Sequence, residues 1–322
     1  MGPTRFPSSL MPNSWPDPGV FKSWVSGAEN TGQVAAFFNS ELLTPETARA
    51  SNATFTIYLR VHLLKTNSND GFHLTTSEGK PVELRDWDDT KGEFVRFSEA
   101  VQSDANGFWD NTKFCLLPPP EYRGMNYPAA NPRFRPNIDC RFKLVFASGP
   151  LDAHAVIRCF CPVRPGEFRS NAIGSFNGAG TGNWTCFDVD PKRHTLLGTG
   201  TCLVDEGDPL SAEGVVKRAR RCNQWIAQEA VCHEVGHLLG MDHVGVYLKY
   251  PPCLQEIAKT KDTASTQCYE GPTEADTRNI MGAGMNLASW NVLPWCSRIV
   301  SHTGVTMAGW RVSIGTVPPR SI

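Results

Sequence analysis

The sequence has no long apolar run of the kind that enters a membrane. A spanning helix needs about 18 or more consecutive apolar residues, and no such stretch occurs in the 322-residue chain. Segment 1–13 contains one arginine and several prolines, but it lacks the run of about 7–15 apolar residues that forms the centre of a signal peptide. We therefore expect no membrane span, and any export would depend on a signal that has been removed or on another route.

A large net charge of either sign is also absent. Lys and Arg number 31 and Asp and Glu number 32, so the formal net charge is −1. Nucleic-acid-binding proteins need clustered positive charge, and the densest basic stretch is the short segment 217–221. No internal repeat is evident. We expect a globular monomer without a nucleic-acid partner.

Cysteine, by contrast, is abundant. The chain has 11 cysteines, which favours an oxidising compartment and therefore a secreted or otherwise exported protein. The number is odd, so at least one thiol stays unpaired unless it bonds to another molecule. The spacings do not match a zinc ribbon, although Cys159 and Cys161 form a C-x-C pair. Cys253 and Cys268 bracket one loop, and we predict a disulfide between them.

The spacing of apolar residues distinguishes two segments in the first part of the chain. The proline-rich segment 1–50 has little repeat, which predicts an N-terminal extension that wraps the surface or blocks a cleft. From Ala53 to Leu63, apolar and polar residues alternate strictly. A two-residue repeat of this kind predicts a strand with one buried face.

A helix is predicted after this strand. Thr90 and Glu93 have the spacing of a capping box, and apolar residues follow at helical intervals from Phe94 to Ala105. Further strands are predicted at 141–147, 154–160 and 183–189. The first half is therefore expected to be a mixed sheet covered by at least one helix, which is an α+β fold.

The segment 223–240 is apolar on most sides at helical spacing, which predicts a buried helix. It leads into the sequence HEVGHLLGMDH at 233–243. Because residues four apart lie on one face of a helix, the imidazoles of His233 and His237 can bind one ion. Glu234 is rotated away from the metal, which leaves its carboxylate able to accept a proton from a zinc-bound water as general base.

A catalytic zinc site needs a third protein ligand and one open position. Gly240 can adopt a positive φ, end the helix and turn the chain so that His243 approaches the same ion. The five fixed positions of this pattern arise by chance in roughly one such chain in 10⁴ to 10⁵. We predict one catalytic Zn²⁺ ion bound by His233, His237 and His243.

The extended motif, together with Asn279-Ile280-Met281-Gly282, resembles the metzincin clan of zinc endopeptidases. In that clan a Met-turn places a methionine, here Met281, beneath the metal. The resemblance implies a metzincin-like two-lobed zinc peptidase domain. Its upper lobe, 51–240, would hold a mixed sheet and end in the zinc helix, and its smaller irregular C-terminal lobe, 241–322, would carry His243 and the Met-turn. Val244 matches none of the family signatures that follow the third histidine, so the resemblance stops at the clan.

Some families of the clan place a tyrosine two residues after the Met-turn methionine, where it reaches the metal or the oxyanion. In this chain that position is Ala283. Tyr247, Tyr250 and Tyr269, which lie between the third histidine and the Met-turn, are the candidates for this role.

These features predict a metalloendopeptidase that binds a protein or peptide substrate in extended form and cleaves it with a water that Glu234 activates. Two alternatives remain open. One is a zinc amidase or toxin-type effector that acts on a non-protein amide such as peptidoglycan. The other is a latent or non-catalytic zinc-binding protein, in which segment 1–50 or the loop at Val244 occludes the site.

Overall fold

The computed structural model describes residues 21–26, 28–30, 35–45, 51–76, 78–110, 114–119, 136–166, 168–175, 179–190, 192–206 and 216–319. These residues form a mixed β-sheet with helices, so the α+β fold class is confirmed. They divide into two compact units. The first contains the described residues up to Asp190, Ala230–Asp242 and those from Leu287 onward, and the second contains Pro191–Glu229 and His243–Asn286.

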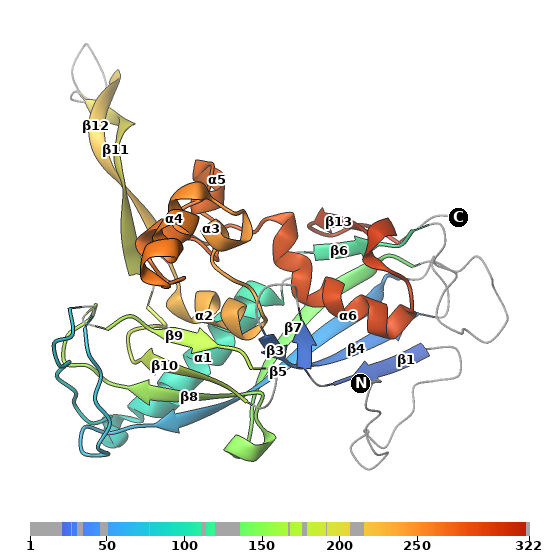
Figure 1. Ribbon diagram of the computed structural model, residues 1–322, viewed down its shortest axis with the longest axis horizontal. Helices are drawn as coiled ribbons and strands as arrows, with labels where there is room; N and C mark the ends of the chain where they lie inside the picture. The colour runs from blue at the N-terminus through green and yellow to red at the C-terminus, as the bar shows by residue number, and fades with distance from the viewer. Residues whose placement is uncertain are drawn as a thin grey trace. The chain divides into compact units, whose positions relative to one another are not determined.

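One nine-stranded sheet forms the centre of the first unit (Figure 1). Seven strands follow the order β13-β6-β7-β5-β8-β10-β9, while β4 pairs with β5 and with β1. β2 (Ala28–Asn30) and β3 (Ala35–Phe37) form a separate small hairpin. The strands of the large sheet are β1 (Phe21–Val25), β4 (Asn39–Thr44), β5 (Ala53–Lys65), β6 (Phe114–Leu117), β7 (Ile138–Phe146), β8 (Ala155–Phe160), β9 (Asn171–Ile173), β10 (Gly180–Thr185) and β13 (Arg311–Ile314).

Residues 1–20 and 46–50 of the expected N-terminal extension lie outside the described residues. Between them, β1 and β4 are part of the large sheet, since β4 pairs with β5 from Asn39 opposite Tyr58 to Leu43 opposite Thr54. This stretch of the expected N-terminal extension is therefore part of the sheet, and the role expected for the rest of segment 1–50 stays a prediction.

β5 is the central strand, and the alternation predicted it correctly. Phe55, Ile57, Leu59 and Val61 are all fully buried, as a face packed into the core requires. β5 runs parallel to β7 and β8 and antiparallel to β4. The strands predicted at 141–147, 154–160 and 183–189 correspond to β7, β8 and β10, with β10 beginning and ending earlier than expected.

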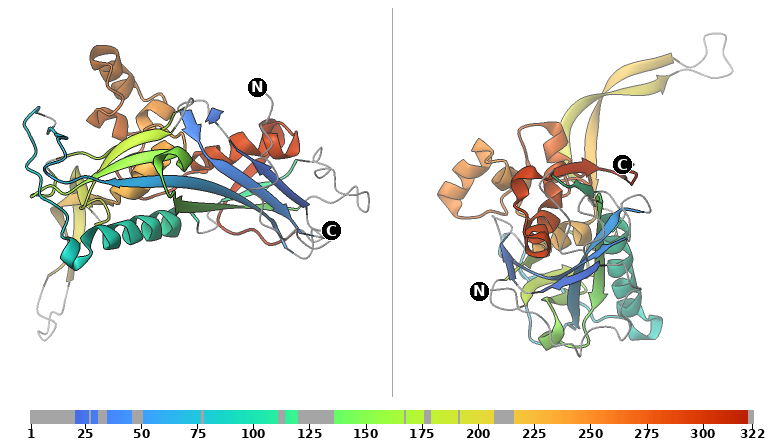
Figure 2. Two further views of the ribbon diagram at one scale, coloured as in Figure 1. Left: turned by 90° about the horizontal axis from the view of Figure 1, so that it is seen from below. Right: turned by 90° about the vertical axis from the view of Figure 1, so that its right-hand side faces the viewer.

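Helix α1 (Glu93–Trp109) lies along the sheet (Figure 2) and covers the free edge of β7. Beyond Cys140, the backbone of β7 bonds to side chains at the end of α1. Asn106 accepts a hydrogen bond from the Leu144 amide at 2.7 Å, and Asp110 accepts one from the Phe142 amide at 2.9 Å. These side chains satisfy strand groups that would otherwise stay unpaired, which fixes α1 on the sheet.

The helix was predicted correctly, but its cap was not. Gly92, with φ 60°, precedes the first helical residue, and Thr90 donates a hydrogen bond to the Asp88 carboxylate instead of capping the helix. Glu93 accepts a hydrogen bond from the Asp88 amide at 2.8 Å and forms an ion pair with Arg85. Asp88 caps a preceding 3₁₀ turn (Asp89–Lys91), so the side chain that caps the start of this region is Asp88 and not Thr90.

The predicted helix 223–240 is wrong over its first part. Residues Val216–Gln228 form β12, which pairs antiparallel with β11 (Lys192–Glu206) as the long two-stranded ribbon in Figure 1. Helix α2 begins only at Ala230 and ends at Leu238. Pairing with β11 satisfies the backbone of 216–228, and this tertiary contact overrides the helix preference of its Ala, Arg and Gln residues.

The second unit also contains short helices: α3 (Val244–Tyr247), α4 (Pro251–Thr260), α5 (Glu274–Thr277) and a 3₁₀ turn (Thr266–Tyr269). A disulfide joins Cys253 to Cys268, as predicted, and it is compatible with an oxidising compartment. In the first unit, α6 (Leu293–Thr303) lies between 3₁₀ turns at Ser289–Val292 and Met307–Gly309, and a further 3₁₀ turn lies at Pro150–Asp152. Among the described residues, no helix has both the length and the hydropathy needed to cross a bilayer.

Candidate metal centre

Helix α2 carries the first two histidines of the motif, and it is anchored in the core of its unit. Trp109, at the end of α1, donates a hydrogen bond from Nε1 to the Cys232 carbonyl at 3.1 Å. The Cys232 thiol, fully buried, lies 3.6 Å from the Asp104 carbonyl. At the other end, the Val231 amide donates to the Asp188 carbonyl at 3.4 Å. The cysteine next to His233 is therefore packed into the core.

The buried Asp188 is a contributor that the sequence analysis did not find. Its carboxylate accepts hydrogen bonds from the Thr185 amide at 2.6 Å and the Thr185 hydroxyl at 3.0 Å, and it also accepts one from the Ser170 hydroxyl. This network shapes the turn after β10, and the carbonyl of the same residue receives the first turn of α2. The start of the histidine helix is thus fixed to the sheet.

Gly240 ends α2 in the way that the motif predicted. Its φ is 83°, in the left-handed region that glycine adopts without steric cost. The Gly240 amide donates to the His237 carbonyl at 2.9 Å and the Met241 amide donates to the Gly236 carbonyl at 3.0 Å. These two bonds make a Schellman motif, which satisfies the last carbonyls of the helix and reverses the chain toward His243.

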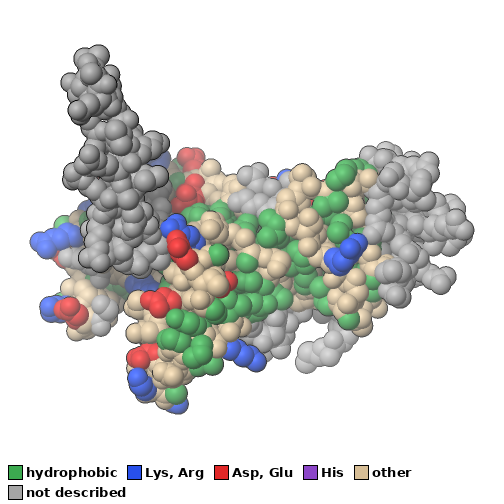
Figure 3. All heavy atoms as spheres, turned by 90° about the horizontal axis from the view of Figure 1, so that it is seen from above, with side chains coloured by type: hydrophobic (Ala, Val, Ile, Leu, Met, Phe, Trp, Pro, Cys, Tyr) green, Lys and Arg blue, Asp and Glu red, His purple; other side chains and the backbone are tan. Residues whose placement is uncertain are grey.

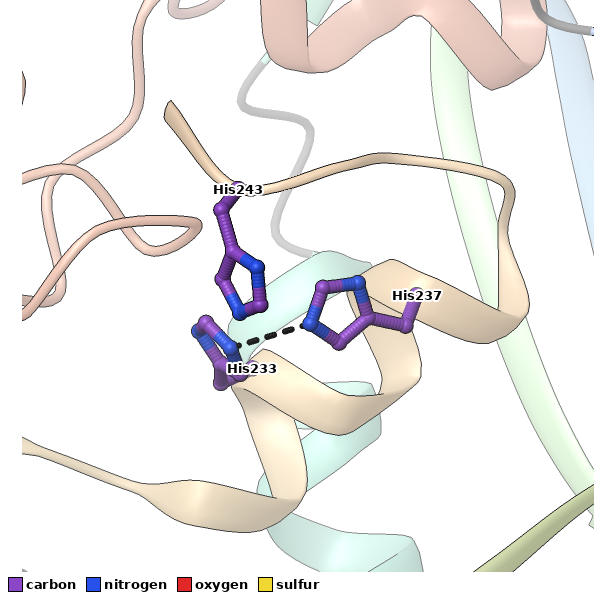
Figure 4. A group of neighbouring side chains, drawn as sticks. All are labelled: His233, His237 and His243. Carbon is purple, nitrogen blue, oxygen red and sulfur yellow. Dashed lines mark hydrogen bonds between the residues drawn. The ribbon is translucent and has the colours of Figure 1, made fainter. Parts of the chain in front are cut away.

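The structure brings His233, His237 and His243 together (Figure 4). One ligand nitrogen from each imidazole lies within 4.8 Å of the others. Nε2 of His233 and Nε2 of His237 are 3.1 Å apart, close to the ~3.3 Å that separates two nitrogens on a tetrahedral zinc ion with bonds of about 2.0–2.1 Å. His233 is 2% exposed and His243 is 4% exposed, whereas His237 is partly exposed. These three residues could hold a metal ion.

Backbone carbonyls orient two of the three rings. Nδ1 of His237 lies 2.8 Å from the Met241 carbonyl, and Nδ1 of His243 lies 2.9 Å from the Thr263 carbonyl. A carbonyl oxygen can only accept, so Nδ1 carries the proton in both rings and Nε2 keeps its lone pair for a metal. Burial lowers the pKa of His237 to about 4, which keeps this ring in the neutral form that binds metals.

Glu234 follows the first histidine on α2 and is 5% exposed. A carboxylate in this position is shielded from bulk solvent and is held by a helix that is itself anchored on α1. The structure therefore keeps the proposed base on a rigid element, although its role in catalysis remains a prediction.

Met281 is fully buried in the second unit. Its carbonyl accepts a hydrogen bond at 2.9 Å from the amide of Val244, the residue that follows His243. Its own amide donates to the Asn279 side chain at 2.9 Å. The predicted Met-turn is thus joined directly to the backbone beside the third histidine.

Gln228 also holds this turn, a role that no sequence pattern indicates. The buried side-chain amide of Gln228 donates to the Gly282 carbonyl at 2.8 Å and to the Ile280 carbonyl at 3.0 Å. The turn is tight as well, since a Cβ added to Gly284 would lie 2.2 Å from the Arg278 carbonyl oxygen. The glutamine belongs to a strand far from the turn in sequence, so no local signal could reveal the contact.

The three candidate tyrosines lie in different places. Tyr247 ends α3, and Tyr250 precedes α4 as its N-terminal cap residue. Tyr269 lies against the third histidine, with 4.1 Å between the ring centroids of Tyr269 and His243. Tyr269 is therefore a candidate that contacts a histidine of the candidate metal centre.

The described surface shows no field of one sign on the face in Figure 3, where acidic and basic side chains are interspersed. This pattern agrees with the net charge of −1.

A comparison of the chain with protein-family models, curated proteins and solved structures found no match.

Proposed function

We propose that this protein is a zinc-dependent endopeptidase of the metzincin type. The observation that carries the proposal is the convergence of three imidazoles within 4.8 Å, with Glu234 directly after the first of them on the same helix. The Met-turn beside Val244 and the helix-ending Gly240 are two further features that support the resemblance. The two-lobed architecture of the clan belongs to the same proposal.

The donor set favours zinc. Three neutral imidazoles match the protein ligands of catalytic zinc sites, whereas Mg²⁺ and Ca²⁺ prefer oxygen ligands. A bound zinc ion supplies Lewis acidity and lowers the pKa of water to about 7. Because all three candidate ligands are uncharged imidazoles, an ion held by them would keep its full positive charge.

The residues of this chain supply the proton transfers. Glu234 accepts a proton from the attacking water and then donates it to the leaving amine, so one carboxylate serves as base and acid in turn. The buried position of Glu234 excludes competing solvent protons. The Met241 and Thr263 carbonyls keep the ligand rings in the tautomer that exposes Nε2.

Metal analysis and peptide hydrolysis on the same samples test the proposal. The wild-type protein should contain one equivalent of zinc and cleave an unstructured protein such as casein. Glu234→Gln should keep the zinc and lose hydrolysis by roughly 10²-fold or more, whereas His237→Ala should lose both. Glu99→Gln, an exposed glutamate on α1, is the matched control and should behave as wild type.

Two outcomes would contradict the proposal. Absence of bound zinc after purification with zinc present would remove its chemical basis. Full hydrolytic activity in Glu234→Gln would show that this carboxylate is not the base. Peptidoglycan assayed in parallel separates the alternative, since cleavage of that amide without cleavage of casein would identify an amidase.

A further inference from the structure

Cys161 and Cys186 follow two neighbouring parallel strands at corresponding positions. β8 and β10 pair in parallel, with Phe160 opposite Thr185 as the last pair of the register. The Cys186 amide donates to the Phe160 carbonyl at 2.9 Å, so the ladder continues one step further. The two cysteines are therefore the next pair of this register, and both side chains project on the same side.

The two sulfur atoms are close but unbridged. They lie, together with a carboxylate oxygen of Glu93, within 4.8 Å of one another. Neighbouring strands are about 4.8 Å apart, and a disulfide needs Cα atoms about 4.4–6.8 Å apart, so the backbone already meets this requirement. Cys161 is 1% exposed, whereas Cys186 is partly exposed.

We propose that Cys161 and Cys186 form a disulfide that ties the end of β8 to the end of β10. The oxidant is a small disulfide such as oxidised glutathione. The sulfur of Cys186, the more accessible one, attacks a sulfur of the oxidant and expels one thiol, leaving a mixed disulfide. The sulfur of Cys161 then attacks Cys186 and expels the second thiol. The protein loses two protons and two electrons, and the oxidant gains them.

The same three side chains could also hold a metal ion, but the surroundings favour the disulfide. Both oxygens of Glu93 are engaged by Arg85, at 2.6 Å and 2.8 Å, and one also accepts from the Asp88 amide. The Arg85 guanidinium holds the pKa of Glu93 at about 2, so the ion pair is stable at neutral pH. A cation at this position would compete with Arg85 for the carboxylate and be repelled by the guanidinium.

The charged carboxylate also disfavours the form of cysteine that binds metals. Sγ of Cys161 lies 3.7 Å from Glu93, and its hydrogen bond with Cys186 and its burial raise the pKa of the Cys161 thiol. A permanent thiolate, which a bound metal would require, would therefore place a second negative charge beside Glu93, whereas disulfide exchange needs the thiolate only transiently. A disulfide is neutral and removes this conflict.

The disulfide would restrain the turn on which the histidine helix α2 begins. Cys186 lies two residues before Asp188, whose carbonyl receives the Val231 amide at the start of α2. A covalent link between β8 and β10 restrains the turn that Asp188 shapes. We expect oxidation to stabilise the fold at the point where α2 begins.

Mapping of the thiols in the full-length protein tests the proposal. The protein is incubated with oxidised glutathione, denatured, treated with iodoacetamide and digested for mass spectrometry. Cys161 and Cys186 should disappear from the alkylated set and appear in one linked peptide. Cys159, a buried thiol on β8, should stay alkylated as the internal control. In Cys186→Ser, alkylation of Cys161 should persist, and the oxidation-dependent rise of several degrees in Tm should be lost.

Three results would overturn the proposal: full alkylation of both cysteines after oxidation, a disulfide from either one to a different cysteine, or binding of a metal ion by these cysteines. The metal outcome is a second zinc equivalent that survives His237→Ala and disappears in Cys186→Ser. None of these results depends on peptidase activity.

Discussion

Replacing Gly240 with alanine should weaken metal binding more than its effect on folding would suggest. Its φ of 83° lies in the left-handed region, which costs a residue with a Cβ roughly 1–2 kcal/mol. Gly304 is a matched control, because it ends α6 at φ 71° and a Cβ there would meet no atom within 4 Å. Gly240→Ala and Gly304→Ala should therefore each lower the free energy of unfolding by about 1 kcal/mol.

Only the first variant should change the metal site. The amides of Gly240 and Met241 form the Schellman bonds, the Met241 carbonyl orients His237, and His243 follows two residues later. If the metal-free protein relaxes its turn, about 1 kcal/mol of the strain appears as lost stability, zinc must restore the turn against the remainder of up to ~1 kcal/mol, and affinity falls by up to about 5-fold. Competition with a chromogenic zinc chelator measures the affinity, and urea unfolding of the metal-free proteins measures stability. Equal zinc affinity in Gly240→Ala, Gly304→Ala and wild type would refute this account of the turn.

Three other predictions concern the metal, the third ligand and acid stability. Removal of the metal with a chelator should lower the free energy of unfolding by about 2.7 kcal/mol relative to protein with free zinc at 100 times its Kd. A Tm that is the same with and without zinc would contradict metal binding to the folded state. Tyr269→Leu should weaken zinc binding about 2-fold to 10-fold because the ring lies against His243, while Tyr247→Leu serves as comparison in the same titration. Burial and the charge of Arg298 lower the pKa of His302 from 6.5 to about 3, so its contribution to stability is complete above pH 6.5 and is lost as the pH falls toward 3. The loss of unfolding free energy between pH 7 and pH 5 should be smaller by roughly 2 kcal/mol in His302→Asn than in wild type, since His154 and His237, whose pKa values burial also lowers, contribute equally in both proteins.

Elements with a local signal could be predicted from the sequence. The alternation in β5 reflects a strand with a core on one face, and that pattern survives in any fold that buries this strand. The spacing of apolar residues in α1 is equally local. The cap of α1 was not predictable in this way, because Glu93 is used by Arg85 and Asp88 and is not available to Thr90.

The boundary at Gln228 shows where local reasoning fails. Residues 223–228 contain helix-favouring side chains and directly precede a real helix, so their sequence alone extends α2 backward. Their strand conformation depends on hydrogen bonds to β11, which lies many residues earlier. No pattern within the segment reports the existence of that partner.

The convergence of the three histidines was predicted despite this error because their geometry is local. His233 and His237 are related by the helical repeat alone, and His243 is related to them by a single glycine turn. Neither relation depends on where α2 begins. The residues that orient and support the site have no such constraint: Thr263, Asp188 and Gln228 act through backbone and side-chain contacts from distant segments. A short motif can therefore identify which atoms meet a metal, whereas the rigidity of the site depends on contacts that only the folded chain defines.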